Sequence, residues 1–371
     1  MRTAPPLAWY GSSFAYYEPD PPATEDELNA AAERARDRRL AAFSPAAFGP
    51  HPGGGDRSGA VLGRFLPVHD GHRYLIEFAR AYAGRVTVFV RVRDDDPIPW
   101  TVRRDWLAEL YPDVDAVPVE DPPTLDWPTV HDHWRTQIRA HVDPDYVFAG
   151  ELDGQGIAHL LDALFVPVDR RAIPVSGTHV RAAPWDFAEF LPPCVRTWYL
   201  RRVCLIGPES TGKSALAERL ARHYQTVHVP EFARTWLGNV DVDWSPATVS
   251  QVAMGQQTTQ ALLARRATRV LFCDTDVLAV RLWSERLFDA APDWVRAASD
   301  TTDVDLYLLT APDLPFTGSD ERHRPAERVA FHARCEAELV RLGRAYVPLE
   351  GDLDERFARA VEAVDALLAR L

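Results

Sequence analysis

Residues 203–214 read Val-Cys-Leu-Ile-Gly-Pro-Glu-Ser-Thr-Gly-Lys-Ser. The four apolar residues predict a buried strand, the glycine-containing run predicts a loop, and a helix is expected over residues 214–223. The loop matches the pattern Gly-x4-Gly-Lys-Ser in full, between a strand and a helix where that pattern has structural meaning. Backbone N–H groups of such a loop surround phosphates, which predicts an ATP site on a parallel α/β sheet. Its expected ATP-binding residues are Gly207, Glu209, Ser210, Thr211, Gly212, Lys213 and Ser214.

Lys213 is the only lysine in the chain, although Lys and Arg together number 41. An ammonium is a compact charge that fits among phosphates inside a tight backbone loop, whereas a wide planar guanidinium is a poor substitute there. We therefore predict that Lys213 contacts the β- and γ-phosphates and is a catalytic residue.

Two acidic residues follow a second apolar strand, predicted over residues 270–273. The carboxyl ends of neighbouring parallel strands meet at one edge of a sheet, which brings these carboxylates toward the phosphate loop. Asp274 is the first candidate for catalytic base or, with the Ser214 hydroxyl, for Mg²⁺ ligand. Asp276 is the second candidate and a candidate substrate contact. The sequence does not separate the two roles.

Two other segments of this half carry candidate ligand contacts. Glu231 can accept hydrogen bonds from sugar hydroxyls, and Arg234 can hold a phosphate or the substrate; a surface ion pair between them is the alternative. The basic run over residues 320–328 includes Arg322, a candidate ATP contact, and has the composition of a lid that closes over ATP.

A different motif occupies residues 63–72, which read Gly-Arg-Phe-Leu-Pro-Val-His-Asp-Gly-His between a predicted strand and a predicted helix. Two imidazoles three residues apart at a helix start can donate hydrogen bonds to one polyphosphate. Farther along, residues 176–181 read Ser-Gly-Thr-His-Val-Arg, which places Ser and Thr at a helix start and Arg one turn later as a phosphate cradle. The candidate ATP contacts are Gly63, Phe65, Gly71, Ser176 and Thr178. The candidate catalytic residues are His69, His72 and Arg181.

Strand and helix patterns alternate in both halves, which is typical of parallel α/β sheets. We expect two such domains, at residues 58–197 and 198–371, after a Pro/Gly-rich extension over residues 1–57 that contains one helix at residues 25–42. The predicted strands cover residues 60–63, 85–92, 146–149, 172–175, 202–206, 270–273, 305–309 and 345–348.

Composition excludes several functional classes. The net charge of −13 lacks the basic footprint of nonspecific DNA binding, and one predicted helix in residues 1–57 is too few for a helix-turn-helix, so DNA is an unexpected partner. No run approaches the ~18 apolar residues of a membrane helix, and the first residues lack a signal-peptide core. The four cysteines are far apart, which favours a reducing cytoplasm over a disulfide framework.

Taken together, these motifs carry a resemblance to a known family. The pairing of Gly-x-Phe-x-Pro-x-His-x-Gly-His with Ser-x-Thr-x-x-Arg resembles nicotinamide-mononucleotide (NMN) adenylyltransferases of the nucleotidylyltransferase superfamily. The phosphate loop, Pro-Glu-Phe-Ala-Arg, Cys-Asp-Thr-Asp and the final Gly-Asp-x-x-x-Arg resemble the ribosylnicotinamide kinase half of NadR-type bifunctional proteins. The order of the two domains is also that of NadR-type proteins.

The resemblance implies a Rossmann-like nucleotidylyltransferase sheet followed by a P-loop kinase sheet. It implies Mg²⁺-dependent phosphorylation of nicotinamide riboside by ATP, then transfer of AMP to the resulting NMN to give NAD and pyrophosphate. It also implies that Trp106 is a candidate to stack on the nicotinamide ring; core packing at helical spacing with Leu107 and Leu110 is the alternative. The alternatives are a riboside kinase with a degenerate first domain and an NAD-sensing regulator. The sequence leaves open the choice between nicotinamide and nicotinate ribosides, the oligomeric state and the role of residues 1–57.

Overall fold

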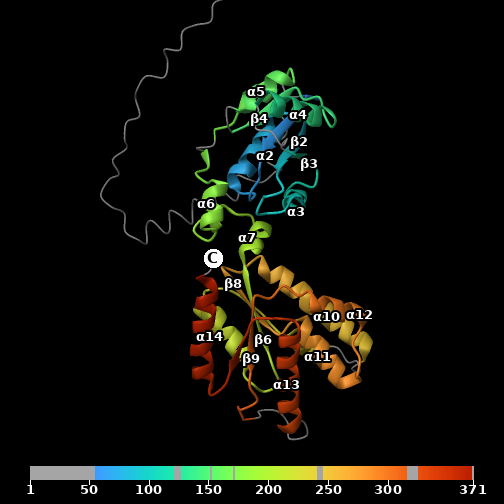
Figure 1. Cartoon of the computed structure of the whole chain (residues 1–371), viewed down its shortest axis with the longest axis vertical. Coiled ribbons are helices and arrows are strands. Elements are labelled where there is room, and N and C mark those ends of the chain that lie inside the picture. The colour runs from blue at the N-terminus through green and yellow to red at the C-terminus, as the bar shows by residue number, and fades with distance from the viewer. Residues whose placement is uncertain are drawn as a thin grey trace, which may run out of the picture.

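The computed structural model of the chain describes residues 55–120, 127–150, 153–169, 172–239, 245–315 and 325–369. The extension up to residue 54, with its predicted helix, lies outside these residues, as does Arg322. Within the described residues, two α/β units lie one above the other and are joined near α7 (Pro193–Tyr199), as Figure 1 shows. No helix among those described is long and apolar enough to cross a membrane.

The N-terminal unit contains a five-stranded parallel sheet in the order β3-β2-β1-β4-β5. Its strands are β1 (Ser58–Gly63), β2 (Arg85–Val92), β3 (Asp115–Glu120), β4 (Tyr146–Ala149) and β5 (Leu164–Pro167). Its helices before α7 are α2 (Asp70–Tyr82), α3 (Trp100–Leu110), α4 (Trp127–Arg139), α5 (Asp153–Leu160) and α6 (Gly177–Ala182).

Alternation of apolar side chains explains why helices cover both faces of this sheet. Val61 and Phe148 belong to the core beneath α2 and α3, whereas their neighbours Ala60 and Val147 belong to the core beneath α4 and α5. Successive strand residues point to opposite faces, so each apolar strand supplies both cores.

The C-terminal unit has a parallel sheet in the order β10-β9-β6-β8-β7. Its strands are β6 (Arg201–Ile206), β7 (His228–Val229), β8 (Val270–Asp274), β9 (Leu306–Thr310) and β10 (Tyr346–Leu349). One face is covered by α8 (Lys213–His223) and α14 (Leu353–Leu368). The opposite face carries α11 (Val277–Phe288) and α13 (Pro325–Arg341). The remaining helices are α9 (Phe232–Asn239), α10 (Pro246–Ala264) and α12 (Asp293–Asp300).

Seven of the eight predicted strands coincide with observed ones to within two residues at either end, and the prediction at residues 172–175 is wrong. β5 pairs with β4 through Leu164–Pro167, and it is this segment that completes the sheet edge. Residues 172–175 instead approach α6 as a loop, and two of their apolar side chains, Ile173 and Val175, line a cavity. Burial against a ligand cavity and burial within a sheet select similar apolar residues, which accounts for the error.

The boundary between the two hydrophobic cores lies at the end of α7. Cys194 and Val195 pack in the N-terminal core, whereas Leu200 packs in the C-terminal one. Across the junction, Arg265 donates to both carboxylate oxygens of Glu109, at 2.6 and 2.5 Å. This ion pair joins the end of α10 to α3.

Candidate functional site

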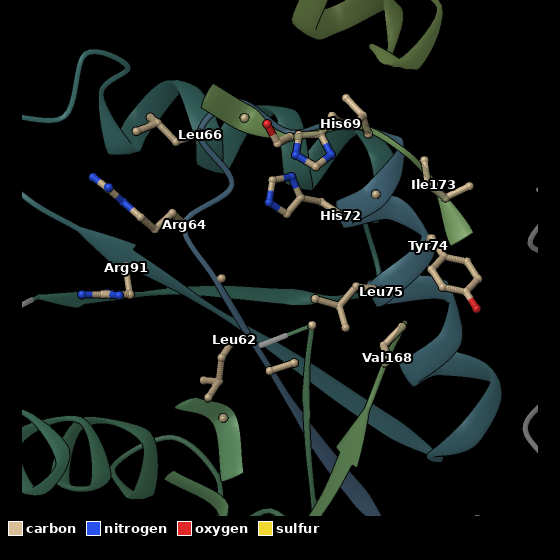
Figure 2. Close-up of a pocket in the computed structure, with 18 of the residues that line it drawn as sticks. Leu62, Arg64, Leu66, His69, His72, Tyr74, Leu75, Arg91, Val168 and Ile173 are labelled. Atoms are coloured by element: carbon tan, nitrogen blue, oxygen red, sulfur yellow. The ribbon is translucent and has the colours of Figure 1, made fainter. Parts of the chain in front are cut away.

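The first candidate site is a cavity of about 280 Å³ at the carboxyl ends of β1 and β4 (Figure 2). Strand order reverses between β1 and β4, and such switch points are where open parallel sheets bind ligands. The cavity unites two predicted segments that are far apart in the sequence. The predicted residues that line it are Gly63, His69, Gly71, His72, Ser176, Thr178 and Arg181.

Two stacked imidazoles lie at the centre of this site. His69 is the N-cap residue of α2 and only 3% exposed, and its ring centroid lies 3.8 Å from that of His72. The Phe65 ring packs 4.6 Å from the same His72 ring. Phe65 is fully buried and does not line the cavity, so it supports His72 from the core and is not the direct ATP contact that the sequence suggested.

Glycine makes this ring packing possible. A Cβ atom on Gly71 would lie 3.0 Å from the His69 ring, and one on Gly63 would lie 2.9 Å from the Phe65 ring. Any larger residue would therefore displace the side chains that orient His72.

Hydrogen bonds attach the second segment to the first. Ser176 caps α6 by accepting from the His179 N–H at 3.2 Å. Arg181 donates to the carbonyl of Leu66, and to the Thr178 hydroxyl at 3.4 Å. Because Leu66 belongs to the loop before α2, these contacts hold the Arg181 guanidinium at the same cavity as the two histidines.

Sequence reasoning missed two arginines of this cavity. Arg64 and Arg91 project from adjacent strands on one side of it (Figure 2), and the Arg91 guanidinium lies 4.5 Å from the centroid of Trp134. The available signal was a charged residue near the end of an otherwise apolar strand. They add positive charge to a site that the sequence had described only through its histidines and Arg181.

Arg103, which is fully buried, fixes the backbone at Arg64 and Arg91 by hydrogen bonds. Arg103 donates to the carbonyls of Arg64 and Arg91 at 2.9 and 3.0 Å, and it pairs with Asp96 at 2.8 Å. Asp96 also pairs with Arg64 at 2.5 Å.

Trp106, by contrast, does not reach the cavity. Its side chain packs in the N-terminal core with Leu107, and its ring lies edge-on to Trp198 with centroids 6.2 Å apart. The structure therefore does not support Trp106 as a stacking partner for the nicotinamide. A tryptophan on the buried face of a helix is accounted for by core packing.

The second candidate site is the phosphate loop after β6. Gly207 has a φ of 145°, and a Cβ there would lie 2.5 Å from the Thr310 hydroxyl oxygen. Thr211 and Thr310 share a hydrogen bond of 2.7 Å, and Gly212 starts α8 with a φ of 79°. Arg356 donates to the Thr211 carbonyl at 3.0 Å. The loop is thus preorganised by backbone conformations that glycine tolerates and by buried polar contacts.

Lys213 lies within this loop and is 6% exposed. Its Nζ donates to the carbonyls of Gly207 and Pro208 at 3.0 and 2.5 Å. Burial lowers the pKa of Lys213, against the raising effect of Glu231 and Asp274. The ammonium is therefore held over the loop, close to two carboxylates.

Asp274 and Ser214 together fit a Mg²⁺ ion. Asp274 Oδ1 and Ser214 Oγ are buried oxygens for which no hydrogen-bond partner is found among the described residues. Burial raises the pKa of Asp274, while the nearby Ser214 hydroxyl and Lys213 ammonium oppose this effect. Unsatisfied buried oxygens are costly unless a ligand engages them, and hard oxygen donors are those that Mg²⁺ prefers.

Glu231 and Arg234 are brought to the same edge. Arg234 donates to Glu231 at 2.7 Å, so the ion pair that the sequence offered as an alternative does form. Both residues act electrostatically on Asp274, Glu231 raising and Arg234 lowering the pKa of that carboxyl group. The pair therefore lies beside the phosphate loop.

Asp276 is not available to a ligand, which corrects its prediction as a substrate contact. It is completely buried and caps α11 by accepting from the Ala279 N–H at 3.1 Å. Its other oxygen accepts from the Tyr307 hydroxyl at 2.6 Å. Burial raises the pKa of Asp276. Of the two acidic candidates, Asp274 is the one that faces the phosphate loop.

Two arginines from α11 and α13 also contact the loop. Arg286 lies 3.7 Å from Glu209, and Arg328 donates to the Ser210 carbonyl at 3.3 Å. Arg328 ends the basic run that the sequence identified as a lid, and Arg322 in the same run lies outside the described residues.

Both units are parallel α/β sheets, and in each the candidate site lies at the carboxyl ends of the strands. This arrangement defines a class of protein with two candidate nucleotide-binding sites, one on each sheet. A family model described as an AAA domain matches residues 202–356. The trifunctional NAD biosynthesis/regulator protein NadR of Salmonella typhimurium is 25% identical over 340 residues, which cover 84% of this chain and 83% of the relative. NadR of Escherichia coli K12 is 24% identical over 342 residues, with the same coverage. The chain is therefore similar to NadR proteins over most of its length.

Solved structures share the two-domain fold. A crystal structure of NadR in complex with NR has a TM-score of 0.68 at 21% identity, and the match covers 83% of this chain and 95% of that one. A NadR structure in complex with NAD and AMP-PNP has a TM-score of 0.67 at 22% identity, with 85% and 97% coverage.

Proposed function

We propose that this chain is a bifunctional transferase. The C-terminal domain phosphorylates nicotinamide riboside with ATP, and the N-terminal domain transfers AMP from a second ATP to the resulting NMN, which gives NAD and pyrophosphate. The names of the relatives support a role in NAD biosynthesis, and the solved neighbours were crystallised with NR or with NAD and AMP-PNP.

The observation that carries the kinase step is the cluster of Lys213, Ser214, Asp274 and Glu231 beside one phosphate loop. Lys213 and the loop N–H groups bind the γ-phosphate, which is transferred, and the β-phosphate, from which it is cleaved. Ser214 and Asp274 would hold a Mg²⁺ ion, which would screen the charge of the phosphates. Asp274 or Glu231 accepts hydrogen bonds from the riboside hydroxyls, which places the 5′-oxygen for attack on the γ-phosphorus. The new P–O bond forms as the bond to ADP breaks, and the carboxylate accepts the proton of the 5′-hydroxyl.

The adenylyl transfer needs no protein nucleophile. The phosphate of NMN attacks the α-phosphorus of ATP, and pyrophosphate leaves. His69, His72 and Arg181 surround one cavity and donate hydrogen bonds to the charge that develops on the phosphates. Arg64 and Arg91 lie on the same cavity and provide a further contact for an anionic group.

The test is incubation of the purified protein with Mg-ATP and nicotinamide riboside, followed by mass spectrometry of the products. The wild type should form NMN and then NAD. Lys213→Ala should form no NMN from the riboside, yet should convert supplied NMN to NAD. His72→Ala should accumulate NMN and form no NAD.

His159→Ala is the matched control, because His159 is exposed on the same domain as His72. It should behave as the wild type. Absence of any phosphorylated riboside in the wild type would refute the kinase assignment. Loss of both activities from either active-site change would refute two independent sites.

A further inference from the structure

We infer that Gln256 of α10 is a positioning residue of the C-terminal site, which sets the distance between the segment carrying Glu231 and the strand end carrying Asp274. The inference rests on the proposed riboside phosphorylation. Gln256 is 1% exposed and belongs to none of the sequence motifs. It joins two loops that the motifs identify only separately.

The backbone itself cannot make this connection. β7 and β8 pair over only two residues of β7, His228 with Phe272 and Val229 with Cys273. The next residue is Pro230, which has no N–H group and cannot continue the ladder. The strand pairing therefore ends at Val229, two residues before Glu231.

Beyond the end of the strand pairing, the side chain of Gln256 connects the two chain segments by hydrogen bonds. Its Oε1 accepts from the Phe232 N–H at 2.8 Å, and its Nε2 donates to the Thr275 carbonyl at 3.2 Å. A primary amide offers the same donor and acceptor as a peptide group, so it bridges two chain segments as an intervening strand would. Phe232 directly follows Glu231, and Thr275 directly follows Asp274.

Two local features indicate that the bridge is closely fitted. A Cβ on Gly255 would lie 2.1 Å from the Phe232 ring, so glycine allows α10 to approach this segment. Thr275 has a φ of 72°, which a β-branched residue adopts only when its surroundings enforce it. Its N–H donates to the Leu205 carbonyl at 3.2 Å, and Gln256 engages its carbonyl. Both backbone groups of this strained residue are thus held.

Loss of the bridge should affect the riboside more than ATP. The phosphate loop belongs to β6 and keeps its own contacts, whereas Glu231 and Asp274 would lose their fixed separation. A misplacement of about 1 Å between reacting groups costs up to about 100-fold in rate. We expect the kcat/KM for riboside to fall by about tenfold or more in Gln256→Met, with an unchanged KM for ATP.

The experiment compares Gln256→Met, which keeps the side-chain volume without the hydrogen bonds, with Gln257→Ala, an exposed neighbour on the same helix. The kcat and KM are measured separately for riboside and for ATP, with the thermal unfolding midpoint of the C-terminal domain as a control for folding. A lower kcat/KM for riboside with an unchanged KM for ATP supports the inference. A wild-type kcat/KM for riboside, or a KM for ATP that rises as much as the KM for riboside, overturns it.

A second measurement does not depend on catalysis. Hydrogen exchange of a peptide covering residues 230–234 should be faster in Gln256→Met than in Gln257→Ala, because the Phe232 N–H loses its acceptor. If the wild type phosphorylates no riboside, the proposed function fails, and this exchange rate alone decides whether Gln256 joins the two segments. Unchanged exchange overturns the bridge itself.

Discussion

Replacement of Lys213 by arginine keeps the positive charge and should nevertheless disable riboside phosphorylation. Nζ lies 3.0 Å from the Gly207 carbonyl and 2.5 Å from the Pro208 carbonyl, within a loop whose shape depends on residues of positive φ. This cradle accommodates one nitrogen. A planar guanidinium would displace its donors from the phosphate oxygens, and a shift of about 1 Å costs about 100-fold in rate. That factor corresponds to about 2.7 kcal/mol of transition-state stabilisation.

Lys213→Ala calibrates the result because it removes the charge altogether. A pair of unit charges about 4 Å apart near a protein surface is worth about 4 kcal/mol, which corresponds to a loss on the order of 1,000-fold. The assay is steady-state formation of phosphorylated riboside, with the thermal unfolding midpoint of the C-terminal domain as a control for folding. Phosphorylation by Lys213→Arg at a near-wild-type rate would refute the reasoning about shape.

Three further predictions concern buried groups. Gly207→Ala should abolish phosphorylation and lower the free energy of unfolding by about 1–3 kcal/mol in thermal denaturation, because its Cβ meets Thr310 and its φ is 145°. Arg103→Met should destabilise the N-terminal domain by about 1.5–3 kcal/mol in urea, since the Arg64 and Arg91 carbonyls lose their donor while Asp96 keeps Arg64 as a partner; an unchanged midpoint would contradict this. Asp274→Asn should abolish phosphorylation yet stabilise the ligand-free protein at pH 7. Burial raises the pKa of this carboxyl group in the folded state, so wild-type stability falls as pH rises above the unfolded value of about 3.9. The stability difference should therefore vanish at low pH, and a difference that grows on acidification would overturn the assignment.

Local sequence was sufficient for most of the fold. Apolar runs of strand length alternate with helical periodicity, and both parallel sheets follow from that alternation. The failure at residues 172–175 has a clear cause. Ile173 and Val175 are apolar because they line a ligand cavity, and pattern alone does not distinguish a cavity wall from a strand.

Candidate site residues were identified from the sequence where they belong to one contiguous motif. They were missed where only the fold brings them to the site. Arg91 and Gln256 each lie in an unremarkable segment, and their roles arise only from contacts with distant chain segments. Trp106 shows the converse case, since the family resemblance suggested a ligand contact and the fold uses the side chain in the core, as its helical spacing with Leu107 also allowed.

The sequence by itself identified the two candidate phosphate-binding loops, because glycine positions and a helix start impose their backbone geometry locally. Only the tertiary structure decided which carboxylate serves the second loop. Asp274 and Asp276 are two residues apart and chemically identical, and the Tyr307 hydroxyl, brought in from β9, occupies one of them and leaves the other facing Ser214. Chemical type is a local property of a residue, whereas availability depends on what the rest of the fold packs against it.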